Sequence, residues 1–146
     1  MIVVSLLANV ALLVAMETSV AATPKVEILG LFKGASTCTK VEGNEFCHDE
    51  VIVYNFVDVP GQPATVALKA ARIVDGTVLR AFDLYVTYRP ETGRWTCEFD
   101  RDKARAVWSF VVSADGLTGT AMLLPELKIV RNVTAKRITK DQVLAP

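Results

Sequence analysis

Histidine occurs once in the chain, beside two carboxylates in the run His48-Asp49-Glu50. On an extended strand His48 and Glu50 project to the same side, as two metal ligands or an acid and base pair would. A zinc site would need further ligands, and the sequence offers neither a second imidazole nor paired thiolates. We therefore predict no metal site here and interpret the run as the solvated start of a strand.

Other catalytic arrangements are weaker still. Any serine or cysteine nucleophile would depend on the same single histidine, and no Gly-x-Ser-x-Gly elbow or glycine-rich phosphate loop occurs. Asp83, Glu98 and Asp100 could approach one another as a carboxylate pair for glycoside chemistry, but acidic side chains on outward faces are the normal case. The sequence predicts a protein that is not an enzyme, with no catalytic residue and no cofactor.

Aromatic residues give the strongest candidate for a binding site. They fall on positions that alternation assigns to the interior, where they either line a small apolar pocket or fill the core. Arg80 lies on the same alternating face as Phe82 near a strand end, where it either recognises a carboxylate at a barrel mouth or extends into solvent. The predicted ligand-binding residues are Tyr54, Phe56, Arg80, Phe82, Tyr88, Trp95, Trp108 and Phe110.

Three cysteines allow one disulfide and leave one thiol. Cys38 and Cys47 flank a short polar connection, and closing so short a loop would stabilise the fold by about 2 to 3 kcal/mol. Cys97 then remains, between Trp95 and Phe99 on an alternating strand, as a buried and unreactive thiol. A bridge between Cys38 and Cys97 is the competing connectivity.

The amino terminus reads as a secretory signal. Residues 2–16 are apolar except for Ser5 and Asn9, a run too short to span a bilayer, and small residues follow at 19–22. We predict a signal peptide over 1–22 and export to a periplasmic or extracellular location, with no stable membrane span after cleavage. The run lacks the usual early basic residue, so an uncleaved anchor or a core helix is the alternative.

The remaining residues, 23–146, are predicted to form a single all-β domain. Segments rich in valine, isoleucine, threonine and aromatics recur every ten to twelve residues between turn signals, as in consecutive hairpins. An antiparallel up-and-down meander of about eight strands, forming a small closed or nearly closed barrel, follows. The predicted strands are 28–37, 50–59, 65–74, 77–88, 94–100, 105–113, 117–124 and 128–137.

Two Asp-Gly pairs predict the pairing of neighbouring strands. At Asp115-Gly116 a two-residue type I′ loop would place Trp108 opposite Leu123 and Phe110 opposite Ala121. At Asp75-Gly76 the same loop length would mix inward and outward faces. There the sequence predicts a three-residue loop over 74–76, with Gly76 as a bulge residue, which would align Leu68 with Phe82 and Val66 with Leu84.

The motif Gly30-Leu31-Phe32 at the start of the meander resembles that of the lipocalin-like, or calycin, barrels. That resemblance implies a basic residue from the last strand packing across the aromatic ring, with Arg137 or Lys136 in this role. The chain also resembles short exported bacterial proteins of unknown function through Gly34-Ala35-Ser36-Thr37-Cys38, Cys47-His48-Asp49-Glu50, Ile73-Val74-Asp75-Gly76, Gly116-Leu117-Thr118-Gly119-Thr120 and Val130-Arg131-Asn132-Val133. This second resemblance implies a shared fold and an envelope location, but no activity.

Charge and fold together define the functional predictions. The chain carries 16 basic and 16 acidic residues, a balance that gives no electrostatic basis for binding nucleic acid or an anionic membrane. The leading prediction is a non-enzymatic barrel that binds a small apolar or amphipathic ligand. The alternative is a structural or interaction module of the cell envelope with a filled barrel, acting through its rim or through an exposed valine face at Val51, Val53 and Val57.

Overall fold

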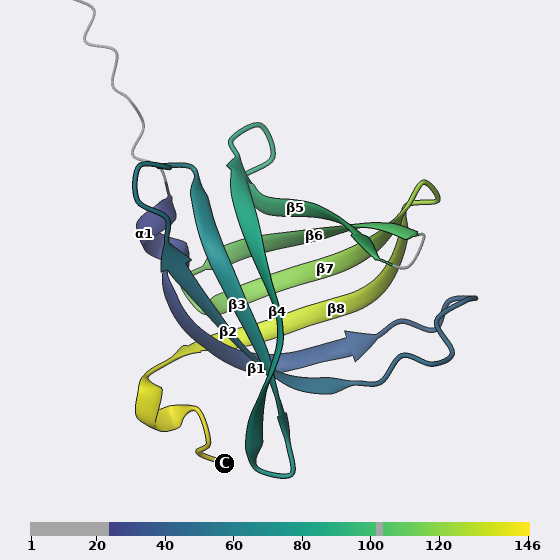
Figure 1. The fold of residues 1–146 in the computed structure, drawn as a ribbon, viewed down its shortest axis with the longest axis horizontal. Helices are drawn as coiled ribbons and strands as arrows, with labels where there is room; N and C mark the ends of the chain where they lie inside the picture. The colour runs from purple at the N-terminus through teal and green to yellow at the C-terminus, as the bar shows by residue number, and fades with distance from the viewer. Residues whose placement is uncertain (1–23, 102–103) are drawn as a thin grey trace, which may run out of the picture.

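The computed structural model describes residues 24–101 and 104–146, so the predicted signal peptide lies outside the described residues. The described chain forms eight strands, with a short helix on either side of them in sequence (Figure 1). The elements are α1 (Lys25–Ile28), β1 (Gly30–Cys38), β2 (Glu50–Asp58), β3 (Thr65–Val74), β4 (Thr77–Arg89), β5 (Arg94–Arg101), β6 (Ala104–Ser113), β7 (Gly116–Leu124), β8 (Lys128–Ile138) and η1 (Lys140–Gln142).

The strands form a closed barrel in sequence order, each antiparallel to the next, and β1 pairs with β8 to complete the circle. This confirms the predicted all-β meander and its closure. Predicted and observed strand ends agree to within two residues. The first strand starts later than expected because the residues after Pro24 form α1 instead, and the buried Ile28 of this helix joins the core.

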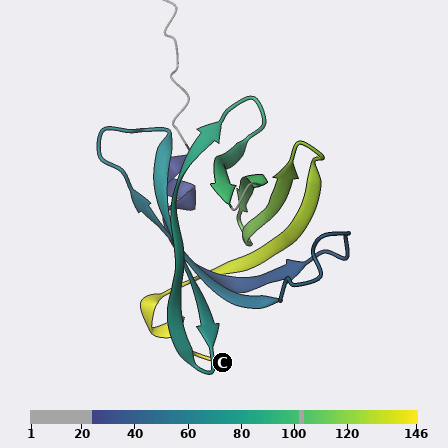
Figure 2. The ribbon, with the colours of Figure 1, turned by 45° about the vertical axis from the view of Figure 1, so that its right-hand side comes forward.

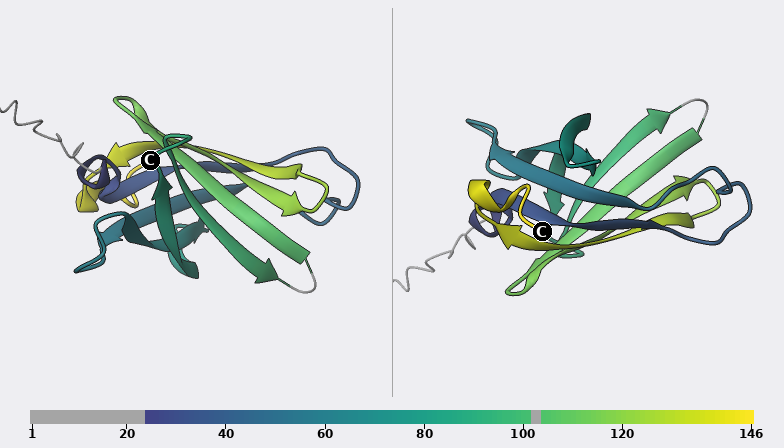
Figure 3. Two further views of the ribbon diagram at one scale, coloured as in Figure 1. Left: turned by 90° about the horizontal axis from the view of Figure 1, so that it is seen from above. Right: turned by 90° about the horizontal axis from the view of Figure 1, so that it is seen from below.

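The two ends of the barrel differ. Helix α1 and the carboxyl terminus lie at one end, while the loops that follow β1 and β7 lie at the other (Figure 3). Lys25 holds α1 in place through an ion pair with Asp58 and a hydrogen bond to the carbonyl of Gln62. No helix in the described part of the chain is long and apolar enough to cross a bilayer.

Alternation along the strands places the apolar side chains inside, as predicted. In β5, Trp95 is buried, and Cys97 and Phe99 on the same face pack against the core. Trp95 lies opposite Phe110 and Cys97 lies opposite Trp108, so both tryptophans belong to the same inner face.

The β6–β7 turn has the predicted length but not the predicted position. Ser113 pairs with Gly116, so the loop is Ala114-Asp115 and Trp108 faces Ala121 instead of Leu123. Neither loop residue has the positive φ that a type I′ turn requires. The structure uses Gly116 in β7, where a Cβ atom would lie 2.2 Å from the carbonyl oxygen of Ala135 in β8.

The prediction of a three-residue β3–β4 loop is wrong. Val74 pairs directly with Thr77 across Asp75-Gly76, both of which have positive φ, as in a type I′ turn. The register shifts within β4 instead: Arg80 faces Ala71 and Phe82 faces Ala70, so Ala81 is the additional residue of a bulge.

This bulge changes the predicted cross-strand partners. Leu68 lies opposite Leu84, and Val66 lies opposite Val86. All four side chains still face inward. The bulge shifts the pairing by one residue, so that inward-facing residues of β3 lie opposite inward-facing residues of β4, which is what the three-residue loop was expected to achieve. The hairpin beyond it projects away from the neighbouring strands (Figures 1 and 2).

Candidate functional site

The end of the barrel nearest α1 is filled by aromatic rings. Phe32, Tyr54, Phe56 and Phe110 are buried, and their rings meet edge to face. Centroid distances are 5.9 Å for Phe32 and Phe56, 5.7 Å for Phe56 and Phe110, and 5.8 Å for Tyr54 and Phe110. Such contacts are typical of a packed core and leave little space for a ligand among these rings.

The barrel wall is weakest between β4 and β5. These strands pair at only three positions, Thr87 with Thr96, Tyr88 with Trp95 and Arg89 with Arg94, and then diverge (Figure 1). The preceding pair, β3 and β4, is joined at ten positions. We call the unpaired stretch, residues 79–86 of β4 and 97–101 of β5, the β4–β5 seam.

Apolar side chains line the inner side of this seam. Phe82 and Leu84 of β4 and Phe99 of β5 are half-buried and pack against the core. Phe82 stacks on Trp108 with centroids 5.8 Å apart, and Trp108 stacks on Phe110 at 5.7 Å. A continuous aromatic stack therefore runs from the seam to the filled end.

Seven of the eight predicted ligand-binding residues lie in this interior, and Arg80 is the exception. Tyr88 and Trp95 are among the seven, and their ring centroids are 5.3 Å apart where the seam ends. Arg80 is placed differently from the expectation. Because of the bulge at Ala81 it does not share the face of Phe82; it lies on the outer face, paired with Asp83 at 2.7 Å.

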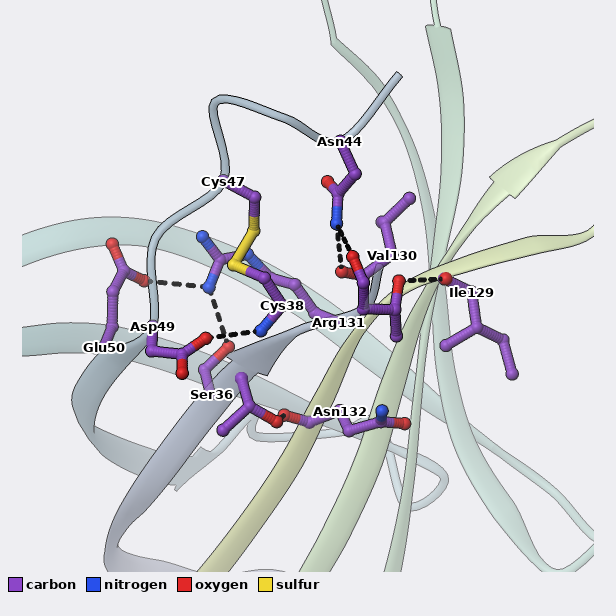
Figure 4. The surroundings of a disulfide bond; sticks show 12 residues. Ser36, Cys38, Asn44, Cys47, Asp49, Glu50, Ile129, Val130, Arg131 and Asn132 are labelled. Carbon is purple, nitrogen blue, oxygen red and sulfur yellow. Dashed lines mark hydrogen bonds and ion pairs between the residues drawn. A yellow bond between two sulfur atoms is a disulfide. The ribbon is translucent and has the colours of Figure 1, made fainter. Parts of the chain in front are cut away.

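The predicted disulfide is present, but Cys97 is less buried than expected. Cys38 and Cys47 form the disulfide (Figure 4), so the alternative bridge between Cys38 and Cys97 is wrong. Cys97 is a free, half-buried thiol at the seam. Burial, followed by the negative charge of Glu98, raises the pKa of this thiol above its usual value, which lowers the fraction of reactive thiolate at neutral pH.

We therefore expect slow alkylation of Cys97. Iodoacetamide at pH 7.5 should label the native protein several times more slowly than the urea-unfolded, disulfide-intact chain, and the rate should rise with pH. Glu98→Gln should speed native labelling because it removes a charge that raises the thiol pKa. Mass spectrometry of quenched samples provides the rates; equal rates in native and unfolded protein would contradict this account of the thiol.

A second feature is a recess of about 480 Å³ at the end of the barrel opposite α1, between the β1–β2 loop and the β3–β4 hairpin. We call it the rim recess. It combines four apolar, two acidic and two basic residues with the single histidine. The lining residues are Phe46, His48, Asp49, Glu50, Val51, Arg72, Ile73, Val74 and Arg131.

An ion-paired cluster lies on the inner side of the rim recess. The carboxylate of Glu50 uses one oxygen for Arg72 Nη1, at 3.1 Å, and the other for Arg131 Nη1, at 3.4 Å. Arg131 Nη1 also donates to Oγ of Ser36 at 3.0 Å (Figure 4). Ser36 is only 1% exposed, so this hydrogen bond satisfies a buried hydroxyl.

The two carboxylates of the histidine run have different partners, and Glu50 is more buried than the predicted solvated strand start. Asp49 accepts the backbone N–H of Cys38 at 2.7 Å, and Glu50 is engaged by the two arginines. Within the described residues, no group of three or more histidine, cysteine, aspartate or glutamate side chains is placed to hold a metal ion.

Tyr54 lies four residues after Glu50 on β2 and is buried inside the barrel. Burial raises the pKa of its hydroxyl far above the usual value, the nearby charge of Arg131 lowers it, and the charge of Glu50 raises it further.

Arg72 and Arg131 were not predicted as site residues from the sequence. Arg131 occurred there only within the segment Val130-Arg131-Asn132-Val133, and nothing local linked either arginine to Glu50, because both lie on other strands and meet Glu50 only in the folded barrel.

The contact implied by the lipocalin resemblance is present. Arg137 of β8 lies over the ring of Phe32, with its guanidinium carbon 4.5 Å from the ring centroid. The same side chain donates to the carbonyl of Leu29 at 2.6 Å, which ties β8 to the start of the meander.

Comparison of the chain with protein-family models, with curated proteins and with solved structures found no match in any of the three.

Proposed function

We propose that this chain is an exported, non-enzymatic, lipocalin-like protein that binds a small apolar or amphipathic molecule inside its barrel. The observation that carries the proposal is the stack of Phe82, Trp108 and Phe110, which leads inward from the β4–β5 seam. A ligand entering there would replace exposed apolar surface by aromatic contacts without breaking a strand pair.

Other features support parts of this proposal. The Cys38–Cys47 disulfide suits an oxidising compartment outside the cytoplasm. The Arg137 contact over Phe32 fits a lipocalin-like arrangement. Both carboxylates beside His48 are engaged by arginines or by a backbone N–H, which favours a binding role over a catalytic one.

Native mass spectrometry of protein purified from its own host tests the proposal directly. We expect a reproducible additional mass that is lost on unfolding, because a bound apolar molecule would survive purification in an aqueous buffer. A protein whose mass always equals that of its polypeptide alone, and that binds no added 1-decanol, would contradict the proposal.

Removal of one ring should weaken binding. Phe82→Ala should reduce affinity for 1-decanol about tenfold, because the stacking partner of Trp108 is lost. The matched control is Tyr85→Ala, which removes an aromatic residue of the same strand that is 67% exposed and faces outward. Titrations followed by tryptophan fluorescence give both affinities; equal losses in the two variants would count against the seam as the site.

The alternative function, an envelope interaction module, is favoured by the filled end and by exposed apolar residues at the rim. Phe46 is 93% exposed, and Val51 and Val74 are also exposed. The predicted valine face is smaller than expected, since Val53 is only 5% exposed and Val57 is half-buried. Failure to bind any small molecule, together with specific capture of an envelope protein, would favour this alternative.

A further inference from the structure

The rim recess and the aromatic stack are connected through the inner face of the barrel. Trp108 pairs with Ala121 of β7, and Ala121 pairs with Arg131 of β8. Arg131 and Trp108 therefore share one row of the inner wall, with only a small alanine between them. On the other side, Arg72 lies two residues along β3 from Ala70, the partner of Phe82.

We propose that Arg72 and Arg131 bind the carboxylate of an amphipathic ligand whose apolar tail lies along Phe82 and Trp108. This inference rests on the proposed function, and it names the chemical class of the ligand: a monocarboxylate with one unbranched apolar chain. Glu50 occupies the carboxylate position in the free protein.

Glu50 shows how a carboxylate fits between the two arginines. Each of its oxygens contacts one guanidinium, and both contacts use Nη1 of the arginine. An arginine has five N–H donors, and in the described residues the Nε and Nη2 groups of these two arginines have no acceptor. The cluster therefore has donors to spare for a second carboxylate.

Partial burial strengthens the interactions of Arg131 and Glu50, whereas Arg72 is half-exposed. The side chains of Arg131 and Glu50 are 20% and 28% exposed, so charge-assisted hydrogen bonds there are screened less than on an open surface. The second carboxylate of the recess, Asp49, is turned to the backbone of Cys38 and does not pair with either arginine. A ligand carboxylate would thus compete chiefly with Glu50.

The test compares decanoate with 1-decanol, which have the same chain length and differ in the head group. Affinities are measured by tryptophan fluorescence at pH 8 and low salt, below the concentration at which decanoate forms micelles. Wild-type protein should bind decanoate about tenfold more tightly than 1-decanol. Glu50→Gln should strengthen decanoate binding about fivefold and leave 1-decanol unchanged, because the competing carboxylate is gone.

Arg72→Gln should abolish most of the preference for decanoate. This arginine is half-exposed, so its loss leaves the core intact, whereas Arg131→Gln would also leave the buried Ser36 hydroxyl without its donor. The matched control is Arg80→Gln, which removes an equal charge from the outer face and should leave the preference unchanged.

The outcomes separate the two proposals. Equal affinity for both probes, or an equal effect of Arg72→Gln and Arg80→Gln, overturns the head-group inference and leaves the binding function standing. Binding of neither probe by the wild-type protein contradicts both proposals.

Discussion

Replacing Gly34 by alanine should destabilise the protein by about 3 kcal/mol or more, or prevent folding altogether. Gly34 lies where β1 pairs with β8 to close the barrel. A Cβ atom at this position would lie 2.0 Å from the carbonyl oxygen of Thr134 and 2.5 Å from Cα of Ala135. Both are backbone atoms, so no side chain can rotate to relieve the overlap and the two strands would have to separate.

Gly61→Ala is the matched control for this substitution. Gly61 has a positive φ of 76°, and nothing lies within 4 Å of the added methyl group, so only the backbone strain of about 1 to 2 kcal/mol should appear. Urea unfolding followed by tryptophan fluorescence compares the two variants. A Gly34→Ala protein as stable as Gly61→Ala would show that β1 and β8 are not in close contact there.

Removal of the disulfide should have the second largest effect. The Cys38→Ala/Cys47→Ala variant should lose about 2 to 3 kcal/mol of stability, because the bridge joins residues nine positions apart and restricts the unfolded chain. The corresponding fall in melting temperature is roughly 10 °C. The loop within the bridge retains only non-covalent contacts, such as the Asn44 side-chain amide donating to the carbonyl of Val130 at 2.9 Å.

Two comparisons make this expectation specific. Dithiothreitol should destabilise the wild-type protein by a similar amount and have no effect on the double variant. Cys97→Ala should cost less, because that thiol is half-buried and unpaired. A reductant effect that persists in the double variant would show that the bridge is not its cause.

The strands and the inner face could be predicted because they depend on local patterns. Trp95, Cys97 and Phe99 alternate with polar residues, and this period of two defines a half-buried strand without knowledge of its neighbours. The same holds for the disulfide, whose cysteines are close in sequence. Nine residues of separation leave few other structures for the intervening loop.

The details of pairing could not be predicted because they depend on contacts between strands. Asp75-Gly76 and Asp115-Gly116 look alike in sequence, yet only the first pair forms the turn itself. Gly116 is needed for its close approach to Ala135, a contact that becomes visible only once the barrel is closed. The bulge at Ala81 likewise has no distinctive residue to mark it.

The rim cluster was hidden for a related reason. Glu50 appeared in the sequence as a neighbour of His48, but its partners are Arg72 and Arg131, which lie on β3 and β8. Ser36 of β1 lies between them: it pairs with Glu50 of β2, and its hydroxyl accepts a hydrogen bond from Arg131 of β8 because β1 also pairs with β8. Local spacing contains no information about such a meeting of three strands.

The uneven barrel wall has a consequence for behaviour in concentrated solution. A ring of strands has no outer strand to which another molecule can add, and the β1–β8 junction removes the usual starting point for such polymerisation. Among the described strands, the diverging edges of β4 and β5 are the exception. Fibril growth or strand exchange between copies should therefore begin there. A ligand bound against Phe82 would cover these edges and inhibit self-association.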